Sequence, residues 1–188
     1  MFKSRISRLS LTSRKVFKSL ALVVLAAAAA GCTVMDRSRH TAQLDQGAKW
    51  VILPMANHTE TPQAGLRAEV ILESLLRQRG LQTLVRPPTL QAGDLMGDLP
   101  DRKVQQDAQR WAAEQGIRYA MTGAVDEWRY KVGVDGEPAV GLVLQVIDLR
   151  SGDVVWTATG AKSGWSREAL SAVGQKLMRD LLGDLSLR

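Results

Sequence analysis

The chain has 188 residues, of which 45% are hydrophobic and 23% charged, a balance typical of a globular protein and too apolar for a disordered one. One cysteine and two histidines cannot supply an internal disulfide or a zinc site built from these residue types alone. The formal net charge of +6 comes from residues 1–31, where every charged side chain is basic. The rest of the chain is neutral, which removes the electrostatic case for nucleic acid as a partner.

The N-terminal segment has the pattern of an export signal. A basic, serine-rich stretch precedes an apolar run of about 11 residues, Leu20 to Ala30, which is too short to span a bilayer and has the length of a signal-peptide core. The run leads into Gly31 and Cys32, and this resembles a bacterial lipobox. The resemblance implies that Cys32 becomes the lipidated first residue of the mature chain. The alternative is a soluble periplasmic protein cleaved at an ordinary small-residue site.

Three segments follow from this pattern. Residues 1–31 are predicted to be a lipoprotein signal peptide, residues 32–47 a polar lipidated tether, and residues 48–188 the folded domain. Residue 33 is threonine, whereas aspartate at that place usually retains such lipoproteins in the inner membrane. The expected location is therefore the periplasmic side of the outer membrane, held by acyl chains that contribute about 0.8 kcal/mol per buried methylene.

Four elements are predicted in the first part of the domain. Residues 49–54 are a short apolar run closed by proline, typical of a buried strand. Residues 61–80 are predicted to be a helix, with Thr61 as its N-cap and a glycine at its end. A strand at residues 81–85 and a helix at residues 100–116 follow.

The second part of the domain is richer in strands. Residues 117–132 are predicted to be a long strand, and Val140 to Leu149 a central strand covered on both sides, because its apolar residues lie on both faces. A turn at Ser151 and Gly152 leads into an antiparallel strand at residues 153–161, and Ser166 is the predicted cap of a last helix. The fold class is thus α/β (α+β), a mixed central sheet of about five strands with three helices, in the order β-α-β-α-β-β-β-α.

The sequence contains little that indicates catalysis. It has no glycine-rich phosphate loop, and its two histidines, His40 and His58, fall in the tether and in a loop. Asp126 and Glu127 are adjacent, so in a strand they would project to opposite faces and not act as a paired acid and base. We therefore expect no enzymatic activity, no cofactor and no metal site.

Two other features each have a structural and a functional interpretation. The acidic residues Asp126, Asp135 and Glu137 are either a solvated surface or one that attracts a cationic partner. Trp165 lies between a glycine and the predicted helix cap. It either packs against the final helix or contacts a membrane interface, where an indole ring is favoured.

The motifs together resemble a known superfamily. The chain is similar to small outer-membrane lipoproteins related to CsgG, LpoB and the TolB N-terminal domain, and its segment 122–165 most resembles the PelC lipoproteins of Pel exopolysaccharide export. The resemblance rests on the lipobox and on three segments: WVILPMANHTETPQAGLRAEVILESLLRQRG, YAMTGAVDEWRY and VGLVLQVIDLRSGDVVWTATGAKSGWS. It implies a homo-oligomeric, dodecameric ring beneath the outer membrane that guides a cationic amino-sugar polymer to a PelB-like porin.

In such a ring, we expect Trp165 and the lipid on Cys32 to mark the membrane side, and Asp126, Asp135 and Glu137 the polymer side. A CsgG-like pore is not expected, because every predicted strand is needed for the core sheet and none remains to span the membrane. The alternative function is that of an LpoB-like activator of a cell-wall synthase, although the tether here is short for that role.

Overall fold

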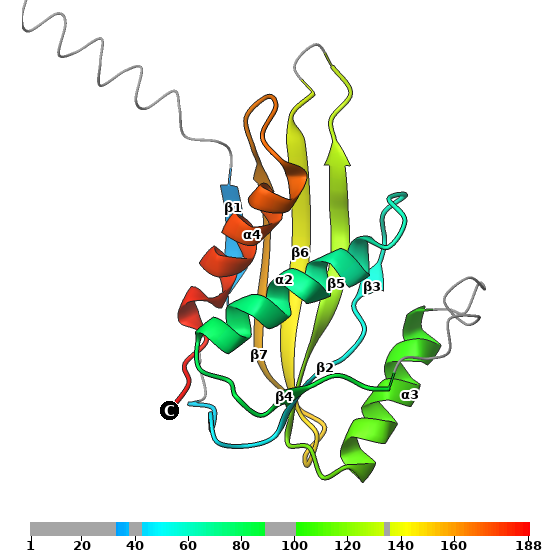
Figure 1. Cartoon of the computed structure of the whole chain (residues 1–188), viewed down its shortest axis with the longest axis vertical. Helices are drawn as coiled ribbons and strands as arrows, with labels where there is room; N and C mark the ends of the chain where they lie inside the picture. The colour runs from blue at the N-terminus through cyan, green and yellow to red at the C-terminus, as the bar shows by residue number, and fades with distance from the viewer. Residues whose placement is uncertain (1–32, 38–42, 89–100, 134–135) are drawn as a thin grey trace, which may run out of the picture. The chain divides into compact units, whose positions relative to one another are not determined.

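The computed structural model describes residues 33–37, 43–88, 101–133 and 136–188, and these form a mixed sheet with helices packed on it (Figure 1). In these ranges the predicted α+β class and the order of the main elements are confirmed, with three helices and seven strands. The strands are β1 (Thr33–Arg37), β2 (Trp50–Ile52), β3 (Ala56–Asn57), β4 (Leu84–Val85), β5 (Tyr119–Tyr130), β6 (Pro138–Asp148) and β7 (Val154–Ser163). The helices are α2 (Ala64–Gln78), α3 (Asp101–Glu114) and α4 (Leu170–Leu181), and a 3-10 turn, η1 (Leu182–Asp184), follows α4.

The sheet combines an antiparallel and a parallel part. Its strand order is β1-β7-β6-β5-β2-β4, and β3 pairs with β5 beyond the end of β2. The long strands β5, β6 and β7 form an antiparallel meander, whereas β2, β3 and β4 are short and run parallel to their neighbours. Past Val125, β5 has no strand paired on its outer side in the described residues, so β1 and β5 are the edges of that half of the sheet.

The first strand was not predicted. Residues 33–37, which the sequence analysis places in the tether, pair antiparallel with β7 from Thr33 opposite Lys162 to Arg37 opposite Ala158. Farther along the same predicted tether, Leu44 is buried and forms a β-bridge with Leu187. The sequence of β1 shows no apolar periodicity. The pairing of β1 depends on backbone hydrogen bonds along the edge of β7 more than on the burial of its side chains.

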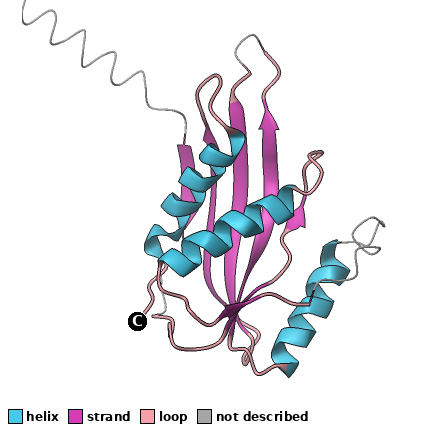
Figure 2. Cartoon of the chain, in the orientation of Figure 1, coloured by secondary structure: helices cyan, strands magenta, loops and turns pink. Residues whose placement is uncertain are grey.

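The main hydrophobic core lies between the sheet and the two helices α2 and α4, which cover the same face (Figure 2). Trp50, Trp128 and Trp156 are each at most 2% exposed there. α4 can approach the sheet closely because it carries Gly174 over the Trp128 ring. A Cβ atom on Gly174 would lie 2.6 Å from the ring's Cη2 atom.

The opposite face of the sheet is covered at one end only. α3 packs there through Ala108 and Ala112 against Val51, Leu53 and Ala120, with Trp111 half-buried beside them. The prediction that β6 is covered on both sides therefore holds near its C-terminal end. It is wrong for the rest of the strand, because α3 is too short to reach the half of the sheet near the β5–β6 connection.

Both predicted helix caps are wrong. α2 begins at Ala64 after Gln63, which has a left-handed backbone with φ 59°, and the Thr61 hydroxyl instead donates a hydrogen bond to the Trp128 carbonyl oxygen. α4 begins at Leu170, four residues after Ser166. A turn at residues 165–168 takes the place of the predicted first helical turn.

Candidate functional site

The uncovered face of the sheet carries a groove of about 970 Å³. Its floor is formed by β6 and β7, one side by β1, and the other by β5 together with the loop at residues 59–62. The floor is shallow because Gly141 and its partner Ala161 place almost no side-chain volume above the strands.

The groove is acidic. Asp36 from β1, Glu60 from the loop, and Asp126 and Glu127 from β5 contribute four carboxylates, against one guanidinium from Arg129. Asp126 and Glu127 were predicted to project to opposite faces, and this is wrong. The ladder between β5 and β6 shifts register between Val125 and Glu127, so a β-bulge brings both side chains to the same groove.

Two of the four carboxylates have basic partners within the described residues. The His58 Nδ1 atom lies 2.8 Å from Asp126 Oδ1, and both side chains are at least half exposed. The Arg129 Nε atom donates to Glu127 Oε1 at 3.1 Å. Neither Asp36 nor Glu60 forms an ion pair in the part of the chain that the structure describes, so these two contribute the least compensated negative charge.

The predicted acidic residues do not form one cluster. Asp126 lines the groove. Glu137, just before β6, lies outside the groove and is exposed to solvent. Asp135 and Cys32 lie outside the described residues. The sequence analysis missed Asp36 and Glu60 as members of the site. Asp36 shares a sheet face with Val34 because residues 33–37 form a strand, and no pattern within those residues predicts that strand.

Trp165 lies in the turn before α4 and is 60% exposed. Its backbone N–H donates to the Glu168 carboxylate, while the Glu168 N–H donates to the Trp165 carbonyl oxygen. The Tyr130 hydroxyl anchors the same turn by donating to the Glu168 carbonyl oxygen and accepting from the Leu170 N–H. The turn thus holds the indole outward, and the interpretation of Trp165 as a residue packed into its own domain is not supported.

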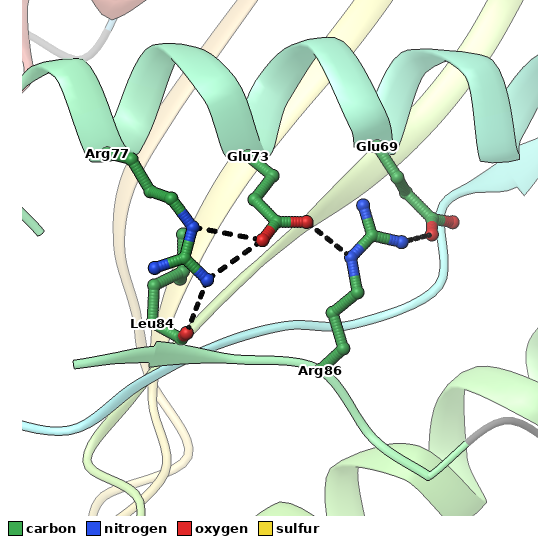
Figure 3. Close-up of polar contacts among 5 residues, drawn as sticks. All are labelled: Glu69, Glu73, Arg77, Leu84 and Arg86. Carbon is green, nitrogen blue, oxygen red and sulfur yellow. Dashed lines mark hydrogen bonds and ion pairs between the residues drawn. The ribbon is translucent and has the colours of Figure 1, made fainter. Parts of the chain in front are cut away.

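A second polar cluster joins α2 to β4 and the segment after it (Figure 3). Glu73 accepts hydrogen bonds from Arg77 at 2.8 Å and from the Arg86 Nε atom at 2.6 Å, and Arg77 also donates to the Leu84 carbonyl oxygen. The Arg77 and Arg86 hydrogen bonds lower the pKa of Glu73 below its ordinary value. This cluster fixes one edge of the sheet to α2.

Glu69, one turn before Glu73, is the buried member of the cluster at 6% exposure. It accepts a hydrogen bond from the Met55 N–H at 2.9 Å and contacts Arg86 at 3.3 Å. Burial raises the pKa of Glu69 above its ordinary value despite these two partners. Glu73, Arg77 and Arg86 hydrogen-bond to one another in Figure 3, whereas the buried Arg86 Nη2 atom has no hydrogen-bond partner in the described residues.

The described residues contain no group of three or more histidine, cysteine, aspartate or glutamate side chains placed to hold a metal ion. None of the helices in these residues is both long and apolar enough to cross a membrane. Three candidate functional features therefore remain in the described residues: the uncovered acidic groove, the exposed Trp165 indole and the edge strand β1.

Comparisons with protein-family models and with the sequences of curated proteins find no match. Solved structures do match, and a distant one shows the fold alone. A lipoprotein from Neisseria meningitidis shares the fold, with 13% identity and a TM-score of 0.51 over 73% of this chain and 97% of that one.

The particular family follows from higher similarity. The PelC dodecamer from Paraburkholderia phytofirmans is 38% identical, with a TM-score of 0.70, over 84% of this chain and 99% of that one. A variant of the same protein, also a dodecamer, gives 38% identity and a TM-score of 0.69 over 85% and 100%. The chain belongs to the PelC family. These comparisons indicate no enzyme family.

Proposed function

We propose that this chain is an outer-membrane lipoprotein that assembles into a ring, twelve-membered as in its relative, and guides a cationic exopolysaccharide to a PelB-like porin. The observation that carries the proposal is the 38% identity to a dodecameric PelC over nearly the whole length of that protein. The uncovered, acidic sheet face supports it, since a protein that works as an assembled scaffold needs surface free for neighbours and for its polymer.

The proposed anchor is the lipid on Cys32. Cys32 precedes Thr33 directly, and consecutive Cα atoms are only about 3.8 Å apart, so the acyl chains would be attached at the beginning of β1 with no tether between. Cys32→Ala is expected to release the mature chain into the soluble periplasmic fraction. Its recovery with the outer membrane would contradict the anchor.

The membrane side of the ring is proposed to be the end of the sheet at which β1 begins. Thr33 pairs with Lys162 there, three residues before the exposed Trp165. An indole at this end of the sheet would enter the lipid headgroup region beside the acyl chains. Trp165→Ala is expected to weaken the binding of the purified protein to vesicles while leaving its melting temperature unchanged.

The polymer side is proposed to carry Asp126, Asp135 and Glu137, on β5 and the connection from β5 to β6. One carboxylate attracts a passing amine by only about 1 kcal/mol at 4 Å in water. A ring repeats each carboxylate around its axis, so these weak attractions sum into a field that concentrates a cationic chain without trapping it. Binding is therefore expected to be sensitive to salt, with a reach of about 8 Å at physiological ionic strength.

The test is polymer secretion by a strain that depends on this protein. The double variant Asp126→Asn with Asp135→Asn is expected to secrete less polymer while it retains its fold and its oligomeric mass. Asp153→Asn is the matched control, because Asp153 is exposed in the turn at the other end of the sheet. Normal secretion by the folded double variant would contradict the polymer-guiding role.

A further inference from the structure

A cavity of about 340 Å³ lies between α2 and α3, and it shares no residue with the acidic groove. One of its walls is formed by the segments that leave β2 and β4, with Pro54 in the first and residues 86–88 in the second. β2 and β4 are parallel, and the helices α2 and α3 lie on opposite faces of the sheet. In open sheets with parallel strands, ligands bind in the crevice outside the carboxyl ends of the strands, and this cavity has that position.

The two helices that enclose the cavity are both fixed to the end of β2. On the α2 side, Glu69 accepts a hydrogen bond from the Met55 N–H at 2.9 Å, and a Cβ atom on Gly65 would lie 2.6 Å from the Met55 carbonyl oxygen. On the α3 side, the Gln105 side chain donates to the Pro54 carbonyl oxygen at 3.0 Å. The cavity is therefore formed before any ligand binds, as is usual for ligand pockets.

The lining of the cavity is mainly apolar and incompletely covered. Leu66 of α2 is 40% exposed although it lines the cavity, and Trp111 of α3 is half-buried. Contact of this apolar surface with water is unfavourable, and a ligand that covers the two side chains would remove it. The volume also falls within the range of about 300–1,000 Å³ that is usual for small-molecule pockets.

The charged side chains that line the cavity already have partners of opposite charge. The Arg86 Nε atom donates to Glu73, and the Arg86 Nη1 atom lies 3.3 Å from Glu69 Oε2 (Figure 3). Asp107 pairs with Lys103 at 2.9 Å. A charged ligand would therefore lose its hydration on entry without finding a free counter-charge, so the cavity favours an uncharged ligand.

The Glu69 carboxylate retains the capacity for a further hydrogen bond. A carboxylate offers about four acceptor positions, and in the described residues the Met55 N–H and Arg86 occupy two of those on Glu69. Burial raises the pKa of Glu69 above its ordinary value even with these donors in place, because its charge is poorly solvated. An N–H or O–H donor on a ligand would compensate for the missing solvation.

We propose that the cavity between α2 and α3 binds a small, uncharged aromatic molecule whose ring lies between Leu66 and Trp111 and whose N–H or O–H group donates to Glu69. An aromatic ring suits these walls because it buries a large apolar area, stacks against other rings and loses little conformational entropy. The site does not depend on the proposed ring of protomers or on the polymer, so its test can fail while the proposed function stands.

Fluorine NMR of a fluorinated indole, added to the full chain in lipid nanodiscs, tests the site. The probe signal is expected to broaden and shift in a saturable way with the natural protein. Leu66→Trp fills the cavity and is expected to weaken binding by about tenfold. Val70→Trp is the matched control, because Val70 is 62% exposed one turn farther along α2 and does not line the cavity. If circular dichroism shows that Leu66→Trp does not fold, Val104→Trp blocks the cavity from α3.

The N-methyl derivative of the same indole has no N–H and isolates the hydrogen bond. The natural protein is expected to bind the indole about tenfold more tightly than this derivative, because hydrogen bonds to a charged group are the stronger ones. Glu69→Gln is expected to reduce that preference, since a neutral amide is the weaker acceptor.

Three results would overturn the proposal. Equal binding of the two probes by the natural protein would indicate a seat for an apolar side chain of another protein, without a hydrogen bond to Glu69. Equal binding of the indole by Leu66→Trp and Val70→Trp would place the probe outside the cavity. Absence of saturable binding by the natural protein would show that the cavity takes no ligand of this class.

Discussion

The contact between α4 and Trp128 gives a prediction whose magnitude follows from the structure. A methyl group on Gly174 would lie 2.6 Å from the Cη2 atom and 2.9 Å from the Cζ3 atom of the indole, where carbon atoms normally stay about 3.5–4.0 Å apart. The ring cannot move aside because Trp128 is 2% exposed. Gly174→Ala therefore has to displace α4 from the sheet by roughly 1 Å.

Two opposing effects decide the stability of this variant. Alanine in place of glycine inside a helix favours folding by about 1 kcal/mol. Overpacking of a tight core costs typically 1–3 kcal/mol, and we expect the upper end because both overlapping atoms belong to a buried ring. The expected net loss is about 1–2 kcal/mol, which for a domain of this size lowers the melting temperature by roughly 3–6 °C.

Thermal and urea unfolding, followed by circular dichroism, measure the change. Gly183→Ala is the matched control, since nothing lies within 4 Å of the place where its Cβ atom would be. The control is expected to stay within about 0.5 kcal/mol of the natural chain. A Gly174→Ala variant as stable as the natural chain, or more stable, would refute the close packing of α4 on Trp128.

The polar cluster on α2 gives two predictions of opposite sign. Arg77 and Arg86 lower the pKa of Glu73. The contribution of Glu73 to stability is therefore present above pH 4.5 and is lost as the pH falls through its folded-state pKa. Glu73→Gln should make acid unfolding less steep. Burial raises the pKa of Glu69, so its contribution is complete below pH 4.5 and is lost as the pH rises through the folded-state value. Glu69→Gln keeps an acceptor for the Met55 N–H and should remove that loss, and an unchanged pH profile of either variant would contradict the assignment.

The elements whose sequences have a strong local pattern were predicted well. The long strands β5, β6 and β7 were predicted because their apolar residues alternate and a glycine turn joins two of them. α3 was predicted because apolar residues recur at helical spacing after a proline. The helix starts failed where a tertiary contact overrode the local pattern, as at Thr61, whose hydroxyl bonds to the Trp128 carbonyl oxygen and not to α2.

The site was harder to predict because it depends on neighbours in space. β1 is specified by the free edge of β7, which no pattern within residues 33–37 reveals. The gathering of Asp126 and Glu127 depends on a bulge, which shifts the alternation on which the sequence argument relied. The exposure of Trp165 follows from a turn held by Glu168 and Tyr130, residues that the sequence alone did not connect with it.

The mass of the lipidated protein in detergent, measured by native mass spectrometry, tests the central claim most directly. The account predicts one assembly of many protomers, twelve if it follows the crystallised relative, formed from chains of 20.5 kDa before removal of the leader. The same assembly should persist in membranes, as judged by cross-linking. A protein that stays monomeric at every concentration, in detergent and in membranes, would contradict the ring and the polymer-guiding function that depends on it.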